Sequence, residues 1–300
     1  MKNVKKMLAI LLVLAMALSL AACGFETKMA VAAKKMEKLE SYRMDMDMDM
    51  ALNMSLLGQS MDLDMGMQGK ADVNTKPMKM KMDMDLTTMG ETIRMLSYAE
   101  KTDAGYVTYI SPDDGDTWVK QTLDGDGIPE ADAATNFALL FKLAGKFEKT
   151  GTETIRGAEA AVFSGTVEGE DIAQMLQMSG VADTLAESMD VELDELGADL
   201  ASLGGVPTTI SVDNKTGYIV RYTMDLTGLM QNLMPAMMDQ LTATITEEAG
   251  MEGLDLSTLG LKLDVSKTVI TVELYDFDAA GTVEIPDEAR EATELSELAA

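Results

Sequence analysis

The sequence contains no histidine and only one cysteine, Cys23. The lack of histidine removes the commonest general acid–base residue and zinc ligand, and one cysteine excludes both internal disulfides and zinc sites built on several cysteines. Basic residues are also scarce: 24 Lys and Arg stand against 51 Asp and Glu, for a net charge of −27 at pH 7. Such a surface excludes nucleic acid as a partner. We therefore predict a protein without catalytic residues or a cofactor.

The remaining composition is that of an ordinary globular protein. Hydrophobic residues make up 47% of the 300 residues and charged residues 25%. This length is close to the upper limit, roughly 250–300 residues, at which a single hydrophobic core stops growing. One domain is expected once the amino-terminal segment is set aside.

The amino terminus has the layout of a secretory signal. Three lysines precede an apolar run, residues 7–20, that is shorter than the roughly 20 residues of a membrane-spanning helix. The segment ends in Leu20, Ala21, Ala22 and Cys23. These residues resemble the lipobox of bacterial lipoproteins, which implies cleavage before Cys23 and acylation of its sulfur. We expect residues 1–22 to be a signal peptide and the folded part to be extracytoplasmic, anchored to the cell membrane by lipid.

Hydrophobic and polar residues alternate over three segments, 44–56, 61–67 and 78–86. A period of two is that of a β-strand with one buried face, and turn residues between the segments predict an antiparallel meander. We call the apolar side the methionine face: Met44, Met46, Met48, Met50, Met54, Met61, Met65, Met67, Met78, Met80, Met82 and Met84. The opposite side is the aspartate face: Asp45, Asp47, Asp49, Asp62, Asp64, Asp83 and Asp85.

The rest of the chain predicts further strands and several helices. The strands are expected at 92–99, 105–110, 117–121, 148–155, 160–167, 206–212, 218–226, 261–275 and 282–285. Amphipathic helices are expected at 29–41, 131–146, 169–187 and 228–241. The last of them carries Met230 and Met234 on its apolar side. Residues 287–300 are acidic and are expected to form a frayed tail.

The order of these elements is similar to that of the LolA/LolB and LppX/LprG group of envelope lipoproteins and carriers, here as a Gram-positive-type member. The features that carry the likeness are Leu39-Glu40-Ser41-Tyr42, Gly157 with Phe163, Val206-Pro207 and Val283-Glu284-Ile285-Pro286. The resemblance implies an α+β fold in one domain, residues 23–286. Its strongly curved antiparallel sheet forms an unclosed half-barrel with helices packed on the concave face. The resemblance also implies an apolar cavity that binds an acyl chain or a lipoprotein.

The methionine face admits three interpretations. Sixteen of the 28 methionines lie between residues 29 and 95 and none between 96 and 174, so the enrichment is local. Fixing a methionine costs up to about 2 kcal/mol of rotamer entropy, against about 0.5–1 kcal/mol for leucine. An ordinary core is one interpretation. Because a tightly packed core would incur this cost at every methionine, a loosely filled, adaptable pocket is the second interpretation. The third is a Cu(I) site, because thioethers select that soft ion. Sulfurs along one strand lie about 6.8 Å apart, so such a site needs partners on adjacent strands.

Three other features are expected to have a structural role rather than a binding role. The aspartate face is expected to be solvated and to oppose aggregation, with weak binding of divalent cations as the alternative. Residues 124–127 resemble the start of a calcium loop, but Ile128 and Thr135 occupy positions that require ligands, so a turn is expected. Trp118 is expected to pack in or beside the core rather than to stack on a sugar.

Together these features predict a non-catalytic, lipid-anchored protein that binds a lipid or acyl chain. The membrane, reached through Cys23, is its expected partner. One alternative is a structural or regulatory envelope module with a closed core, and another is a Cu(I)-binding protein. The candidate ligand-binding residues are Met44, Met46, Met48, Met65, Met67, Met80, Met82, Met84, Met230 and Met234.

Overall fold

Strands and a few short helices make up the part of the chain that the structure, a computed structural model, describes. The described residues are 28, 31–32, 34–56, 59–103, 105–124, 147–169, 171, 204–232, 234 and 262–298. The strands are β1 (Ser41–Leu56), β2 (Gln59–Thr75), β3 (Met78–Thr88), β4 (Glu91–Thr102), β5 (Gly105–Ser111), β6 (Val119–Asp124), β7 (Glu148–Ile155), β8 (Ala158–Val167), β9 (Val206–Asp213), β10 (Ile219–Asp225), β11 (Lys262–Tyr275) and β12 (Thr293–Glu294). Two short helices, α7 (Asp287–Arg290) and α8 (Leu295–Leu298), lie near the carboxyl end.

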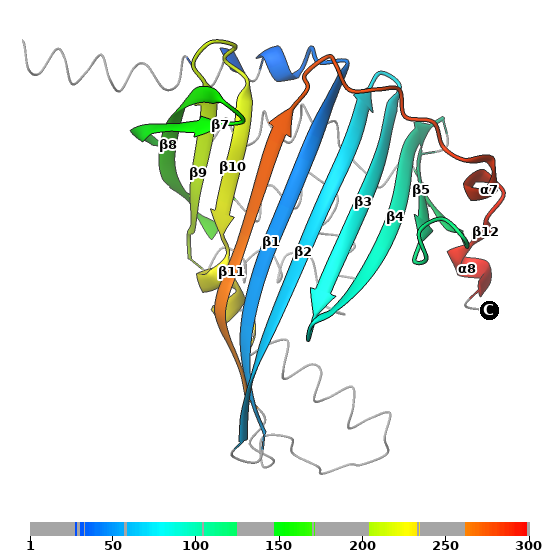
Figure 1. The fold of residues 1–300 in the computed structure, drawn as a ribbon, viewed down its shortest axis with the longest axis horizontal. Helices are drawn as coiled ribbons and strands as arrows, with labels where there is room; N and C mark the ends of the chain where they lie inside the picture. Colours follow the sequence, from blue (N-terminus) through cyan, green and yellow to red (C-terminus); the bar gives the residue numbers. More distant parts are fainter. Residues whose placement is uncertain are drawn as a thin grey trace, which may run out of the picture.

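These strands form one large unclosed sheet in the order β12-β6-β5-β4-β3-β2-β1-β11-β10-β9-β8-β7 (Figure 1). Neighbours are antiparallel, except that β12 runs parallel to β6. Near the middle of the sheet, β1 pairs along its length with β2 on one side and β11 on the other. The predicted unclosed antiparallel sheet is thus confirmed for the described residues.

The predicted meander is confirmed as β1, β2 and β3, with longer strands than expected. The period of two continues through Gly69, Ala71 and Val73, so β2 extends well past Met67. The strand predicted at 282–285 is wrong. There the Val283 amide donates to the Asn74 side chain (2.7 Å) instead of to a neighbouring strand, while the Val283 and Ile285 side chains are buried. The alternation of apolar and polar residues at 282–285 reflects the burial of these two side chains, and the segment does not pair as a strand.

The predicted helices are only partly described. Within 29–41 the described helical residues end at 36, and within 228–241 the helical residues are 228–232 and 234. Residues 131–146 and nearly all of 169–187 lie outside the described residues. The packing of helices on a concave face therefore stays a prediction.

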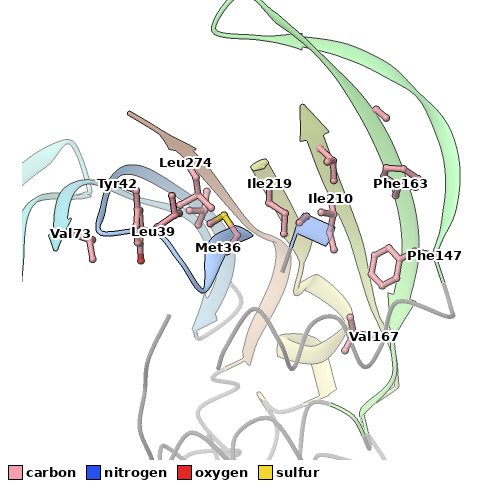
Figure 2. Packing of buried hydrophobic residues seen from close by; sticks show 14 of the residues in the cluster. Met36, Leu39, Tyr42, Val73, Phe147, Phe163, Val167, Ile210, Ile219 and Leu274 are labelled. Carbon is pink, nitrogen blue, oxygen red and sulfur yellow. The ribbon is translucent and has the colours of Figure 1, made fainter. Parts of the chain in front are cut away.

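The main hydrophobic core lies on the same side of the sheet as the methionine face. Met36 and Leu39, from the segment before β1, pack with Tyr42 on β1, Val73 on β2 and Leu274 on β11 (Figure 2). Further members lie on β8, β9 and β10 and include Phe163, Val167, Ile210 and Ile219. Fully burying one such side chain stabilises the fold by about 1.5–3 kcal/mol, so this cluster is a principal source of stability.

A second, smaller core involves the carboxyl-terminal residues. Val283, Ile285 and Ala289 are buried against Tyr98 and Tyr109. The Glu100 carboxylate, itself buried, accepts hydrogen bonds from the Tyr109 hydroxyl (3.0 Å) and from Arg290. The frayed tail expected at 287–300 is therefore wrong for residues 287–298, because Ala289 and the Arg290–Glu100 ion pair hold α7 against β4 and β5, and β12 pairs with β6.

Candidate functional site

The twelve residues of the methionine face share one side of the sheet, as predicted. Opposed residues of antiparallel strands project to the same side. Between β1 and β2 the opposed pairs are Met48–Met67, Met50–Met65 and Met54–Met61. Between β2 and β3, Met84 lies opposite Gly69 and Met82 opposite Ala71. Thioethers from different strands are thus direct neighbours.

The apolar side continues beyond the meander. Opposite Met46 lies Val272 on β11, followed in the same row by Tyr222 on β10 and Ile210 on β9. Burial raises the pKa of the Tyr222 phenol above its usual value. These residues were missed from the sequence, because isolated Val, Tyr and Ile residues in ordinary alternation do not stand out. Only the strand order joins them to the methionine face.

The methionines of this face become more exposed with distance from the main core. Met44, Met46, Met80 and Met82 are partly buried and pack against the main core. Farther from that core, Met48, Met50, Met65 and Met67 are half-buried, and Met61 is 44% exposed. The face therefore begins as an extension of the core and becomes accessible toward the β1–β2 turn.

A glycine interrupts the row of methionines. Gly69 lies between Met84 on β3 and Met46 on β1. A Cβ atom at this position would lie 3.5 Å from the Met46 Cε and 3.6 Å from the Met84 Cγ, so both side chains border the space over the glycine. Glycine weakens a strand and often marks a place where a ligand or another backbone approaches closely. This position was missed from the sequence, although an isolated glycine in an alternating strand was a usable signal.

Two predicted site residues lie apart from the meander. Met230 and Met234 are helical and half-buried, and Leu229 of the same segment packs against the main core. The structure thus brings this segment to the core. Contact of Met230 and Met234 with the methionine face stays a prediction.

The aspartate face is laced with hydrogen bonds and ion pairs. Lys81 pairs with Asp83 on the same strand (3.1 Å), whereas other partners come from distant strands and turns. Arg156, in the β7–β8 turn, binds Asp45 on β1 and Glu273 on β11, and its guanidinium lies 3.7 Å from the centre of the Tyr275 ring. Further pairs are Arg94–Asp85 (3.2 Å), Lys267–Asp49 (2.9 Å), Gln68–Asp47 (3.1 Å) and Asn53–Asp62 (2.7 Å).

A depression of about 400 Å³ lies on the aspartate face. Five of its lining residues are acidic and two, Lys70 and Arg94, are basic. The acidic residues are Asp45, Asp47, Asp83, Asp85 and Glu273. Among the described residues, no three acidic side chains come close enough together to hold a metal ion. The alternative of divalent-cation binding by the aspartate face thus gains no support from the described residues.

The other features noted in the sequence have simpler outcomes. Trp118 is partly buried, packs against the second core near Tyr98, and donates its indole N–H to the Gly115 carbonyl (3.0 Å), so its predicted packing role is confirmed. Cys23 and residues 125–127 lie outside the described residues. In the described part of the chain, no helix is long and apolar enough to span a membrane.

Comparison with known proteins gives a family. Residues 26–227 match the model of a family of unknown function, DUF6612. The chain belongs to this family. The match covers the strands β1 to β10 and most of the main core, but not β11 or β12. No curated protein matches the chain.

Several solved structures resemble this DUF6612 chain. LprF from Mycobacterium bovis is 12% identical, with a TM-score of 0.43, over 88% of this chain and 97% of that one. The Mycobacterium tuberculosis lipoprotein LppX is 11% identical, with a TM-score of 0.42, over 87% and 98%. A LolA superfamily protein from Nitrosomonas europaea is 8% identical, with a TM-score of 0.17, over 88% and 96%. At such low identities and TM-scores, these likenesses say nothing about function.

Proposed function

We propose that this chain is an extracytoplasmic lipoprotein, anchored through acylated Cys23, that binds a lipid or acyl chain on the methionine face without catalysis. The observation that carries the proposal is the continuous apolar side of the sheet. It runs in register from β3 to β9, and its middle portion is half-buried instead of closed. A folded protein keeps such an extended apolar surface partly open mainly where something binds.

The residue type supports the same interpretation. A methionine that stays mobile avoids the rotamer cost of up to about 2 kcal/mol that a fixed one incurs. The flexible and polarizable thioether also adapts to ligands of different shape. Met48, Met50, Met65 and Met67 are half-buried, whereas the buried main core of the described residues uses mostly Val, Ala, Leu, Ile and Phe and contains one methionine, Met36. The methionines therefore lie where adaptability matters more than rigid packing.

Native mass spectrometry and fatty-acid uptake test this proposal. The mature chain from residue 23, with Cys23→Ser, is expected to retain lipid on purification and to bind a fluorescent fatty acid after delipidation. Met48→Phe combined with Met65→Phe is expected to lower the affinity at least tenfold by filling the accessible part of the face. Met89→Phe is the matched control, because Met89 lies in the β3–β4 turn and is 69% exposed.

The competing interpretation is a closed envelope module that binds no ligand. It predicts a lipid-free preparation, no fatty-acid uptake, and equal behaviour of the two Phe variants. Circular dichroism of each variant separates loss of binding from loss of folding. A folded, lipid-free protein without uptake would overturn the proposed function.

A further inference from the structure

Methionine side chains border the position above Gly69 on several sides. Met46 and Met84 flank it within the same row, with side-chain carbons 3.5 and 3.6 Å from the missing Cβ position. Met67 precedes Gly69 by two residues on β2 and therefore projects to the same side. Met48 lies directly opposite Met67. Four methionines from three adjacent strands thus border one position without a side chain.

The spacing allows these sulfurs to meet at one point. Directly opposed residues in antiparallel strands have Cβ atoms about 4.5–5.5 Å apart, and successive residues on one face lie about 6.8 Å apart along the strand. A methionine side chain has three rotatable bonds and can close such a separation. One strand alone cannot bring its sulfurs together, but β1, β2 and β3 in register can. Gly69 is buried beneath these side chains and adds no side chain of its own between them.

The chemistry of these donors selects one class of ion. Neutral thioethers are soft ligands that favour Cu(I), whereas Mg²⁺, Ca²⁺ and Mn²⁺ require oxygen ligands. The carboxylates of this region lie on the opposite side of the sheet, because they alternate with the methionines along each strand. On β1, β2 and β3, the methionine side of the sheet therefore presents sulfur donors, and the Asp side chains project from the other side.

The electrostatic surroundings favour a cation here. The depression on the aspartate face includes Met46 and Gly69 in its lining, so it lies directly behind the same patch of sheet. Its five acidic residues outnumber its two basic ones. Four of these carboxylates pair with Arg156, Lys81 or Arg94, so it is the net charge of −27 of the whole chain that raises the local concentration of cations, and none of these carboxylates needs to coordinate the ion.

We infer that the space over Gly69 is a Cu(I) site formed by the thioethers of Met46, Met67 and Met84, with Met48 beside them. The inference is independent of the lipid-binding proposal, although both use the methionine face. Binding involves no redox step, because the ion is supplied and held as Cu(I). The half-buried positions of these methionines give the ion access from solvent.

Competition with a colorimetric Cu(I) chelator under reducing, anaerobic conditions tests the inference, with the full chain in lipid nanodiscs. One Cu(I) per chain at micromolar or tighter affinity is expected, with a shell of sulfur scatterers alone in X-ray absorption. Met46→Leu combined with Met84→Leu is expected to weaken binding at least tenfold. The matched control, Met54→Leu with Met61→Leu, changes an opposed pair on the same face, several rows away, and should leave the affinity unchanged.

Glycine substitutions provide a second test. Gly69→Val is expected to abolish Cu(I) binding, because the Cβ fits at ordinary contact distance while the added methyl groups fill the space. Gly66→Val is the control, since it lies in the same strand, on the other side, with nothing within 4 Å of its Cβ position. A thermal unfolding curve for each variant checks that it is folded.

The outcomes separate the copper site from the proposed function. Fatty-acid uptake without stoichiometric Cu(I) binding overturns the copper site alone. Cu(I) binding without fatty-acid uptake overturns the lipid-binding proposal alone. Equal loss of Cu(I) affinity in the Met54 and Met61 control would also overturn the assignment to Gly69, because binding would then be diffuse.

Discussion

Arg156 occupies a backbone conformation that does not suit it, and its side-chain contacts explain why it is tolerated there. It forms the two-residue β7–β8 turn with Gly157, and both residues have positive φ, +48° and +82°. Asn-Gly is the favoured sequence for such a turn, because asparagine accepts the left-handed region more readily than arginine. We therefore predict opposing backbone and side-chain effects when Arg156 is replaced.

The magnitudes follow from the contacts. Arg156 binds Asp45 and Glu273 and stacks on Tyr275, with its side chain 41% exposed. At this exposure each ion pair contributes about 0.5–1 kcal/mol, and the cation–π contact contributes about 0.5–1 kcal/mol. Arg156→Ala should thus lower the free energy of unfolding by about 2 kcal/mol. Arg156→Asn should regain about 1 kcal/mol in the turn and lower it by only about 1 kcal/mol.

Urea unfolding at low and high salt measures both effects. The difference between the wild-type chain and Arg156→Ala should shrink at high salt, because salt screens the partly exposed ion pairs. The difference between the Asn and Ala variants should persist, because backbone preference does not depend on ionic strength. A double-mutant cycle with Asp45→Asn isolates one ion pair. An Asn variant no more stable than the Ala variant would refute the backbone part of this reasoning.

Two further predictions concern hydrogen-bonded carboxylates. Arg290→Met should lower the free energy of unfolding by about 2 kcal/mol, because buried Glu100 loses a charged partner. The same change should speed proteolysis of residues 287–298. An unchanged cleavage rate would contradict the role of the Arg290–Glu100 pair in holding this segment. Burial raises the pKa of Asp213, but hydrogen bonds from Thr216 and Lys215 outweigh it and lower that pKa below 3.8. Its charge-dependent stabilisation is therefore fully present above pH 3.8 and is lost as the pH falls through the lowered pKa, so the stability difference between wild type and Asp213→Asn should shrink below about pH 4. A difference that stays constant in acid-unfolding curves down to pH 2 would exclude this linkage.

Much of the sheet could be predicted because its strands alternate so regularly. The Met-Asp repeats of β1 and β3 left one face for burial and fixed the register between neighbours, since a shift of one residue would expose every methionine. The full order of the strands in the sheet could not be predicted from local sequence patterns. Pairing of β1 with β11 joins residues far apart in the chain, and no local pattern shows that Val272 lies opposite Met46.

The errors have physical causes too. Residues 282–285 alternate like a strand because the side chains of Val283 and Ile285 enter the second core. Their backbone does not pair with a strand; instead the Val283 amide donates to the Asn74 side chain on β2. Residues 287–298 appeared too acidic to pack, but Arg290 finds a buried carboxylate on β4. Gly69 is visible in the sequence as a glycine in an alternating segment, but its neighbours Met46 and Met84 follow only from the pairing of β2 with β1 and β3.

The pairing of β12 with β6 has a consequence for the handling of this protein. In the part of the chain that the structure describes, Thr293 and Glu294 alone pair with the outer edge of β6, and the Glu294 carboxylate reinforces this pairing by accepting a hydrogen bond from the Thr122 hydroxyl (2.7 Å). Trimming by a carboxypeptidase would strip this cover and leave backbone groups of β6 free to recruit a strand from another molecule. Preparations that lose their last eight residues should therefore form dimers and larger aggregates on storage, whereas intact ones should not.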